Sequence, residues 1–396
     1  MQEFDAIVVG AGPAGLAAAR KLAEAKMNVV CLEKKQEIGV PKRCAEGLGG
    51  GWFERLEIKP DKRWALREIE GAALYAPSGK KLEIRFNRTA GYVLERRVFE
   101  KELAKDAVKA GAKIRVKHPV KSAERENGKV KITAGIKDEE EYYSAPLVIA
   151  CDGVETQTAR MLGLNTVNKL NDIDSGYQYE MAGIDYEGDD LINLFFGIDV
   201  APRGYVWIFP KGKHEANVGI GIGGQLGETA KSYLDKFVQS HPGLREGSIV
   251  EVNAGAVPVG GFLDDMTAEN LLVAGDAAHQ VNPIHGGGIG LAMEGARLAA
   301  DVAIESHAKG DCSHKFLQKY NPAWYEKRGN QLKSILKRRH LFESLNDKDL
   351  EIIVDSLTGE DVLKIAEGEL VESAKIVGKK LVKHPGLAKI MLKYLK

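Results

Sequence analysis

Residues 4–15, Phe-Asp-Ala-Ile-Val-Val-Gly-Ala-Gly-Pro-Ala-Gly, decide the fold of this chain. Phe4–Val9 is a short apolar run of the kind that forms a buried parallel strand, and Pro13–Lys26 has the Ala, Leu and Lys content of a helix. A second apolar run, Asn28–Leu32, completes a strand–helix–strand unit. The glycines therefore stand at the turn where such units bind dinucleotides.

Each glycine of this turn has its own physical role in forming a site for a pyrophosphate. Gly10 allows the tight turn, Gly12 lets the backbone approach the anion, and Gly15 lets the helix pack closely on the strand. The N-terminus of the helix then favours negative charge. Glu33 follows Gly15 by 18 positions and ends the second strand, where a carboxylate accepts hydrogen bonds from ribose hydroxyls and disfavours a 2′-phosphate.

Composition restricts the class of protein. The 396 residues predict two to three domains at about 150 residues each. Hydrophobic residues at 44% and charged residues at 28% exclude a disordered or collagen-like chain. Lys+Arg and Asp+Glu both total 56, so the balance argues against nucleic acid as a partner. Four cysteines without a C-x-x-C pair predict neither a disulfide scaffold nor a metal site.

The two ends of the chain bear on its location. The N-terminus has no signal-peptide pattern and no apolar run reaches about 18 residues, which predicts a cytoplasmic protein. Residues 373–396 hold seven lysines and no acid. Their apolar residues share one helical face: Leu387, Ile390, Met391, Tyr394 and Leu395. This pattern fits either a docked helix with a solvated lysine face or a helix resting on the anionic inner face of the cell membrane.

The fold class predicted is α/β (α+β overall), with a Rossmann-like domain, an inserted antiparallel sheet and a helical C-terminal part. Alternating and apolar runs predict the strands of the sheet: Ser175–Asp185, Leu191–Asp199, Tyr205–Pro210 and Ala216–Ile222. A further buried strand is predicted at Pro146–Ala150, and helices are predicted at Arg96–Ala110, Lys315–Asn346 and Gly359–Leu381. We expect residues 1–170 and 251–310 to form the nucleotide-binding domain, with parts of 60–95 open to either domain. Residues 171–250 would then form the substrate domain and 311–396 the helical part.

A second segment specifies the dinucleotide. Residues 272–279, Leu-Val-Ala-Gly-Asp-Ala-Ala-His, precede Pro283 and three glycines, and they resemble the second FAD fingerprint of the para-hydroxybenzoate hydroxylase-like flavoproteins. The resemblance implies FAD as cofactor, with Asp276 on the ribityl chain and the glycine-rich helix start near the pyrophosphate and isoalloxazine. The Asp-Gly pair at Asp152 resembles a third motif of the group, and Arg96 stands where the group keeps a flavin-contacting arginine.

Two further segments narrow the resemblance to the geranylgeranyl reductase family, especially its archaeal members. Pro41-Lys-Arg-Cys-Ala-Glu-Gly-Leu48 resembles the P-x-R-C-x-E-G segment of that family, and residues 202–210 resemble its Y-x-W-x-F-P motif. The match spans roughly residues 1–310 in order. It implies an FAD-dependent enzyme that saturates C=C bonds of geranylgeranyl chains in ether lipids by hydride transfer from flavin N5.

The resemblance also implies the site residues. The implied FAD-binding residues are Gly10, Gly12, Ala14, Gly15, Glu33, Arg43, Cys44, Ala45, Gly47, Arg96, Val120, Asp152, Asp276, Gly287, Gly288 and Ile289. The implied substrate wall is Tyr205, Trp207, Phe209 and Pro210, of which the three aromatic residues share one face of an alternating strand.

Cys44 is the candidate catalytic residue. A thiol there could donate the proton that accompanies the hydride, with Arg43 as the nearby cation, and a bound water is an equal rival as proton donor. Arg203 and Lys211 are candidates for the phosphate of a polyprenyl ether lipid because they flank the aromatic motif. The expected electron donor is reduced ferredoxin or NAD(P)H, for which no second dinucleotide fingerprint is needed.

Three other functions stay open at this stage. An aromatic hydroxylase would share the scaffold but leave the cysteine and aromatic segments unexplained. A reductase of chlorophyll or quinone tails would share the chemistry and differ in the substrate. A prenyl-binding escort protein would need no flavin, and the intact FAD motifs argue against it.

Overall fold

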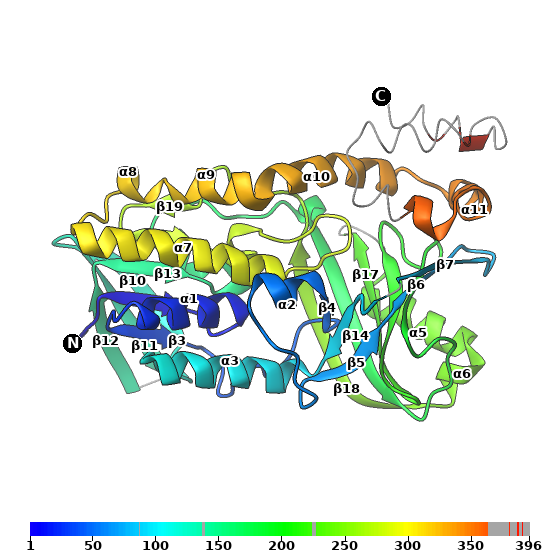
Figure 1. Cartoon of the computed structure of the whole chain (residues 1–396), viewed down its shortest axis with the longest axis horizontal. Coiled ribbons are helices and arrows are strands. Elements are labelled where there is room, and N and C mark those ends of the chain that lie inside the picture. The colour runs from blue at the N-terminus through cyan, green and yellow to red at the C-terminus, as the bar shows by residue number, and fades with distance from the viewer. Residues whose placement is uncertain are drawn as a thin grey trace.

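The computed structural model describes residues 1–86, 88–136, 139–223 and 227–362, together with residues 380, 386, 387 and 390. The molecule is elongated, with a nucleotide-binding half that carries the N-terminus and a second half built around a large sheet (Figure 1). Within the described residues, no helix combines the length and the apolar character needed to cross a bilayer.

A six-stranded sheet forms the centre of the nucleotide-binding half, in the order β19-β20-β13-β2-β3-β9. All neighbours are parallel except the β19–β20 pair. Its strands are β2 (Ala6–Val9), β3 (Val29–Leu32), β9 (Lys113–Arg115), β13 (Leu147–Ala150), β19 (Thr267–Ala268) and β20 (Leu271–Val273). The strands predicted near residues 4–9, 28–32 and 146–150 are thus confirmed to within two residues.

Helices and a second sheet cover the two faces of this central sheet. The helices α1 (Pro13–Glu24), α3 (Arg96–Ala110) and α7 (Ile289–Lys309) lie along one face, with α1 between the other two (Figure 1). The other face packs against a four-stranded sheet whose apolar side chains join the same core. The strands of that sheet, in spatial order, are β1 (Gln2–Glu3), β12 (Glu139–Ala145), β11 (Lys129–Ile136) and β10 (Val120–Glu126).

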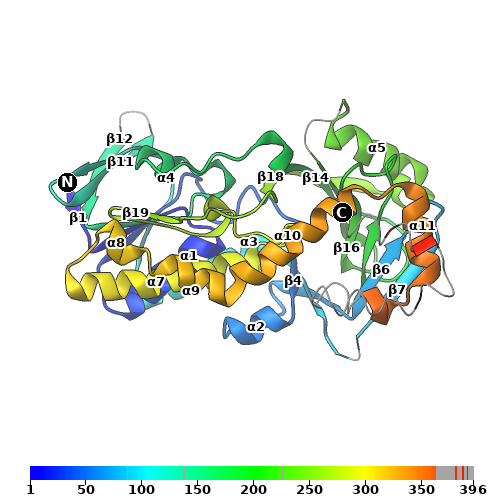
Figure 2. The same ribbon diagram turned by 90° about the horizontal axis from the view of Figure 1, so that it is seen from above.

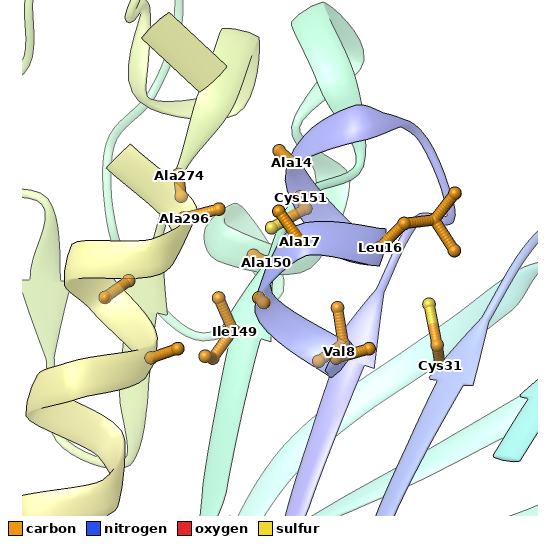
Figure 3. Close-up of a cluster of buried hydrophobic side chains, with 14 of the residues drawn as sticks. Val8, Ala14, Leu16, Ala17, Cys31, Ile149, Ala150, Cys151, Ala274 and Ala296 are labelled. Carbon is orange, nitrogen blue, oxygen red and sulfur yellow. The ribbon is translucent and has the colours of Figure 1, made fainter. Parts of the chain in front are cut away.

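Small side chains let α1 and α7 approach the sheet closely. Figure 3 shows Ala17 of α1 and Ala296 of α7 beside Ala150 at the end of β13. Close approach also explains two glycines of the nucleotide turn. A Cβ at Gly15 would lie 1.8 Å from the carbonyl oxygen of Gly10, and Gly10 itself has a φ of +97°.

A seven-stranded sheet, in the order β18-β14-β17-β16-β15-β6-β7, forms the second half of the molecule. All its pairs are antiparallel except β15 with β6. Its strands are β6 (Gly71–Tyr75), β7 (Lys81–Arg85), β14 (Ile173–Ala182), β15 (Leu191–Phe195), β16 (Tyr205–Gly212), β17 (Glu215–Gly223) and β18 (Ser248–Pro258). The helices α5 (Ala230–Ser240) and α6 (Pro242–Arg245) pack on its outer face.

The expected boundary at residue 251 is wrong, because it falls inside β18. That strand pairs with β14 along almost its whole length, so it belongs to the seven-stranded sheet and not to the nucleotide-binding half. Residues 71–85 also belong to this sheet, through β6. A small sheet of β4 (Gly47–Gly49), β8 (Gly91–Leu94) and β5 (Ala65–Ile69), with α2 (Gly51–Arg55) beside it, connects the two halves.

The C-terminal helices do not form a separate unit throughout. Leu317, Tyr320 and Trp324, from α8 (His314–Leu317) and α9 (Tyr320–Trp324), are buried in the nucleotide-binding core. A π-helical turn at Tyr325–Gly329 then interrupts the single helix expected over 315–346. Beyond it, α10 (Asn330–Glu343) runs from one half of the molecule to the other, and α11 (Asp347–Ser356) lies near β7 (Figures 1 and 2).

Four residues of the basic C-terminal segment are described, and two of them, Leu387 and Ile390, belong to its expected apolar face. Leu387 and Ile390 are buried together with Leu345 in a small apolar cluster that also touches α11. This favours the docked-helix interpretation at these two positions. The other residues of the expected apolar face, Met391, Tyr394 and Leu395, lie outside the described residues, as does most of the helix expected over 359–381.

Candidate functional site

One continuous cavity of about 1720 Å³ runs from the nucleotide turn across the inner face of the seven-stranded sheet to α11. It is lined by nearly all of the sequence-predicted site residues. Gly15 and Pro210 are the two that do not line it. Gly15 has the packing role expected of it, whereas Pro210 alternates away from the aromatic face, so its assignment to the substrate wall is wrong.

The dinucleotide turn is held in shape by Glu33. The buried carboxylate accepts hydrogen bonds from the backbone N–H groups of Ala11 (2.7 Å) and Lys35 (2.9 Å). A Cβ at Gly12 would meet no atom within 4 Å, because this backbone faces the open cavity. Gly12 is also the N-cap of α1, and no side chain caps it, which leaves the first N–H groups of the helix available to an anion.

Two aspartates complete a site for a polyhydroxylated cofactor. Asp152 follows β13, and burial raises its pKa despite its bond from the N–H of Thr158 (2.8 Å). Its other carboxylate oxygen is buried without a protein partner. Asp276 follows β20, and burial raises its pKa too, against the attraction of Arg96. Buried oxygens of this kind are normally hydrogen-bonded, so the pair fits the hydroxyl groups of FAD.

The glycine-rich segment 285–288, which we call the flavin loop, is anchored from two sides. The hydroxyl of Tyr205 on β16 donates to the carbonyl of His285 (2.7 Å). The guanidinium of Arg339 on α10 donates to the carbonyl of Pro283 (2.6 Å) and pairs with Asp174 of β14 (2.8 Å). These anchors place Gly287, Gly288 and Ile289 at the uncapped N-terminus of α7, where they line the cavity.

The cysteine segment Pro41–Gly47 crosses the middle of the cavity. The Cys44 sulfur accepts a hydrogen bond from the N–H of Glu46 (3.2 Å), and the Cys44 carbonyl accepts one from the side chain of Gln178 (3.2 Å). The cation beside Cys44 is Arg96, which pairs with Glu100. Burial opposes the charge of Arg96, but the interactions with Glu100 and Cys44 raise its pKa. Arg43, the cation expected there, points instead to Glu155 (3.1 Å).

Behind this segment lies a buried ionic cluster of Lys42, Glu46, Glu95, Glu180 and Lys211. Lys211 contacts the carboxylates of Glu46 (3.1 Å), Glu95 (3.0 Å) and Glu180 (3.2 Å), which together raise its pKa against the effect of burial. Lys42 contacts Glu46 (3.1 Å) and Glu180. Lys211 is therefore neutralised inside the protein, and its assignment to the lipid phosphate is wrong. Arg203 does line the cavity, where it pairs with Glu343 (3.0 Å).

The aromatic residues of β16 form one wall of the cavity. The ring centroids of Tyr205 and Trp207 lie 5.9 Å apart, and those of Trp207 and Phe209 lie 6.3 Å apart. The indole N–H of Trp207 donates to Gln178 (2.8 Å), and a Cβ at Gly47 would lie 2.9 Å from the ring of Phe209. The wall thus packs directly on the cysteine segment.

The half of the cavity that lies beyond these aromatic residues is apolar. We call this part the distal channel. Strands β6, β7 and β15 supply one side of it, and α10 and α11 supply the other. The apolar residues that line it are Ala72, Leu74, Leu82, Ile84, Ile192, Leu194, Ile335, Phe342, Leu350, Ile353, Val354 and Leu357, with Leu387 and Ile390. Arg338, Arg339 and Glu343 of α10 also line the cavity.

The sequence did not indicate the roles of several of these residues. Gln178, Glu180 and Asn217 come from strands far along the chain from Cys44, and no local pattern links them to it. The alternating segment at 71–85 was a detectable signal for a half-buried hairpin, although not for its pairing with β15. Arg339 lies in a helix rich in basic residues, where burial cannot be read from spacing alone.

Two protein families match different parts of the chain. Residues 3–178 and 257–326 match the family described as FAD binding domain, and residues 172–257 match the geranylgeranyl reductase catalytic domain. The latter segment ends within β18, in keeping with the place of that strand in the large sheet.

Curated and solved relatives cover nearly the whole chain. It is 40% identical to digeranylgeranylglycerophospholipid reductase 2 of Methanopyrus kandleri, with 98% of each chain covered. It is 38% identical to digeranylgeranylglycerophospholipid reductase 1 of Methanothermobacter thermautotrophicus, with 96% of this chain and 97% of the relative covered. A crystal structure of a geranylgeranyl bacteriochlorophyll reductase-like protein from Thermoplasma acidophilum superposes with a TM-score of 0.89 at 34% identity, covering 98% of this chain and 100% of the other.

The fold and the cofactor site define an FAD-dependent oxidoreductase. Halogenases such as PltM share the fold at a TM-score of 0.70 and only 14% identity, which shows the fold alone. The chain belongs to the geranylgeranyl reductase family.

Proposed function

We propose that this enzyme saturates C=C bonds in the geranylgeranyl chains of digeranylgeranylglycerophospholipids. The observation that carries the proposal is the continuity of the cavity, in which a cofactor end with buried aspartates opens directly into the apolar distal channel. The names of the curated relatives, which cover almost the full chain, support this substrate. A linear polyprenyl chain is the kind of ligand that an apolar channel accommodates.

The protein has to orient an unreactive alkene and exclude water. When bound, reduced FAD supplies a hydride to one alkene carbon. The residues that would hold FAD are Glu33, Asp152 and Asp276 with the helix starts of α1 and α7. Tyr205, Trp207 and Phe209 would hold the alkene in place, which provides the positioning on which this reaction depends.

The second alkene carbon needs a proton, and we propose Cys44 as its donor. Its sulfur lies in the cavity wall between the N–H of Glu46 and the guanidinium of Arg96. Transfer of the thiol proton would leave a thiolate that both neighbours stabilise. Cys44→Ser should lower kcat by about 10²-fold while FAD content is unchanged. A rate within twofold of the wild type would assign the proton to a bound water instead.

An anaerobic single-turnover experiment tests the function itself. The bound flavin is reduced with dithionite and mixed with digeranylgeranylglyceryl phosphate, and flavin absorbance and lipid mass are followed. We expect reoxidation coupled to the gain of one H₂ per double bond. A flavin that stays reduced until air enters would overturn the proposal and favour oxygen chemistry. The same lipid assay with reduced ferredoxin or NAD(P)H in place of dithionite identifies the electron donor.

We also propose that the enzyme contacts the membrane that holds its substrate, at the inner face. The lysine-rich end of the chain supports this, because Lys389, Lys393 and Lys396 follow closely in the sequence after Leu387, which docks on the protein together with Ile390. Replacement of these three lysines by glutamate should abolish flotation with anionic vesicles. A matched replacement of Lys105 and Lys109 on α3 should not. Unchanged flotation of the first variant would exclude this segment as the contact.

A further inference from the structure

The carboxylate of Glu46 is the most completely enclosed acidic group beside the cavity. Its side chain has no exposed surface. One oxygen accepts the backbone N–H of Arg96 at 2.8 Å. The other accepts the side-chain amide of Asn217 at 2.8 Å and lies 3.1 Å from the ammonium groups of both Lys42 and Lys211. Three donors from α3, β16 and β17 and a fourth from the cysteine segment itself thus converge on one side chain.

This side chain holds an unusual backbone. Glu46 has a φ of +73°, a left-handed conformation that costs a residue with a Cβ roughly 1 kcal/mol. In that conformation its own N–H points at the Cys44 sulfur, 3.2 Å away. The four side-chain contacts are therefore what keeps this N–H directed at the sulfur.

The same carboxylate positions the second partner of Cys44. The N–H of Arg96 that it accepts is the first of α3, and the guanidinium of Arg96 interacts electrostatically with Cys44. Glu46 thus controls one contact of the sulfur through its own backbone and the other through the start of α3. The lysines supply the counter-charge that lets a carboxylate sit there without water.

We propose that Glu46 is a positioning residue that holds the Cys44 sulfur between its own N–H and the Arg96 guanidinium, so that the thiolate form of Cys44 is stabilised. The part of this proposal that concerns turnover rests on the proposed function, whereas the part that concerns the thiol does not. The charged groups around Cys44 are Arg96 and Glu100 of α3, with Asp276 beyond Arg96, and Lys42 and Glu46 of its own segment; β14 contributes the neutral Gln178.

Charge alone and positioning predict opposite results when Glu46 becomes glutamine. Loss of the carboxylate leaves the positive charges of Lys42 and Lys211 in excess, and on charge alone this excess would favour the thiolate form of Cys44. If Glu46 acts by positioning, its own N–H and the guanidinium of Arg96 both lose their alignment with the Cys44 sulfur, and the thiolate form of Cys44 is destabilised. The direction of change in thiol reactivity therefore separates the two explanations.

The experiment measures alkylation of Cys44 by iodoacetamide in the FAD-loaded protein, from about pH 6 to about pH 10. A Cys312→Ser background removes the half-buried thiol, and burial raises the pKa of Cys31 and Cys151, so both react slowly. Peptide mass spectrometry follows Cys44 directly. We expect Glu46→Gln to move the midpoint of the rate–pH curve upward and to slow the reaction about tenfold at neutral pH.

Glu95→Gln is the matched control. It removes a carboxylate that contacts the same Lys211 at 3.0 Å, but Glu95 makes no hydrogen bond to the cysteine segment or to the N–H of Arg96 among the contacts described. The midpoint of its rate–pH curve should not move, and its alkylation rate at neutral pH should stay within about twofold of the wild-type rate. If Glu46→Gln does not fold, the charge-balanced pair Glu46→Gln with Lys211→Met serves instead, with the same expected upward shift.

A midpoint that stays unchanged or moves downward in the Glu46 variants would overturn the proposal. In steady-state assays, positioning predicts a lower kcat with KM for the lipid unchanged, and a purely structural role would reduce FAD content in step with activity. Failure of the proposed function is distinguishable, because it would appear as a reduced flavin that lipid does not reoxidise in the wild-type protein, whatever the alkylation result.

Discussion

Tyr205 connects the substrate wall to the cofactor. Its ring faces the cavity, as the alternation of β16 predicts, but its hydroxyl holds the flavin loop at the carbonyl of His285. The residue that packs on a substrate chain is therefore also the one that fixes the loop at the start of α7. A single hydroxyl group here affects cofactor binding, whereas the neighbouring Trp207 and Phe209 contribute apolar surface.

Tyr205→Phe should weaken FAD binding about fivefold, because one hydrogen bond to the flavin loop is lost at a net cost of about 1 kcal/mol. Titration of the apoprotein with FAD, followed by quenching of flavin fluorescence, measures the effect. Tyr75→Phe is the matched control, since its hydroxyl contacts Asn193 in the distal channel (3.3 Å) and FAD affinity should not change. Equal affinities in the two variants would contradict the anchoring role.

Glu95 makes the stability of the enzyme sensitive to acid. Burial would raise the pKa of this carboxyl, but the hydrogen bonds from Arg97 and Lys211 hold it at about 2, below its ordinary value of 4.5. Its contribution is thus fully present above pH 4.5 and is lost as the pH falls towards 2. Glu95→Gln should lower the free energy of unfolding by about 1 kcal/mol at pH 7, a value reduced for partial solvent screening. Urea unfolding should show that difference shrinking below pH 4.5, and a constant difference would refute it.

At the scale of elements, α11 forms the end wall of the distal channel. Its apolar residues line the channel, and its polar side is attached to the turn between β6 and β7. The carboxylate of Glu351 accepts hydrogen bonds from the N–H and the hydroxyl of Ser78, both at 2.7 Å, and Asp355 pairs with Lys80 at 2.8 Å. The channel length is thus determined by where this helix is held.

Ile353→Trp should shorten the channel, because the indole would occupy space near its end. We expect kcat/KM for a geranylgeranyl lipid to fall at least about tenfold, with little change for a geranyl lipid of half that chain length. Competition between the two lipids, with products separated by mass, measures the ratio. Lys348→Trp, on the exposed face of the same helix, should leave the ratio unchanged. An equal loss for both lipids would show that the lipid chain does not extend to this end of the distal channel.

Elements with a strong local signal could be predicted from the sequence, and elements defined by distant partners could not. The helix at Arg96–Ala110 has the predicted bounds, and the strand ends at Glu33, Asp152 and Asp276 converge because parallel strands place their carboxyl ends together. The pairing of β6 with β15, some 120 positions later, cannot be recognised from the sequence of either segment. Nor does spacing reveal that Lys211 turns inward to three carboxylates while Arg203 reaches the cavity.

At the scale of the whole molecule, the seven-stranded sheet is assembled from three separate stretches of chain. Strands β6 and β7 come before the nucleotide-binding strands are complete, β14 to β17 form the middle, and β18 comes after α5 and α6. The catalytic family segment, residues 172–257, contains only the last two stretches. Two of the seven strands, β6 and β7, thus lie outside it, and so do α10 and α11 on the other side of the distal channel.

This assembly has a consequence for recombination between relatives. A chimera that exchanges only residues 172–257 would pair β15 of the donor with β6 of the host. Strands that did not evolve together would then form one wall of the distal channel. Exchange of residues 65–94 together with 172–257 transfers the whole sheet. We expect the second chimera to adopt the chain-length preference of its donor and the first to retain much of the host's. The inheritance of specificity in this enzyme therefore follows the sheet and not the contiguous segment of sequence.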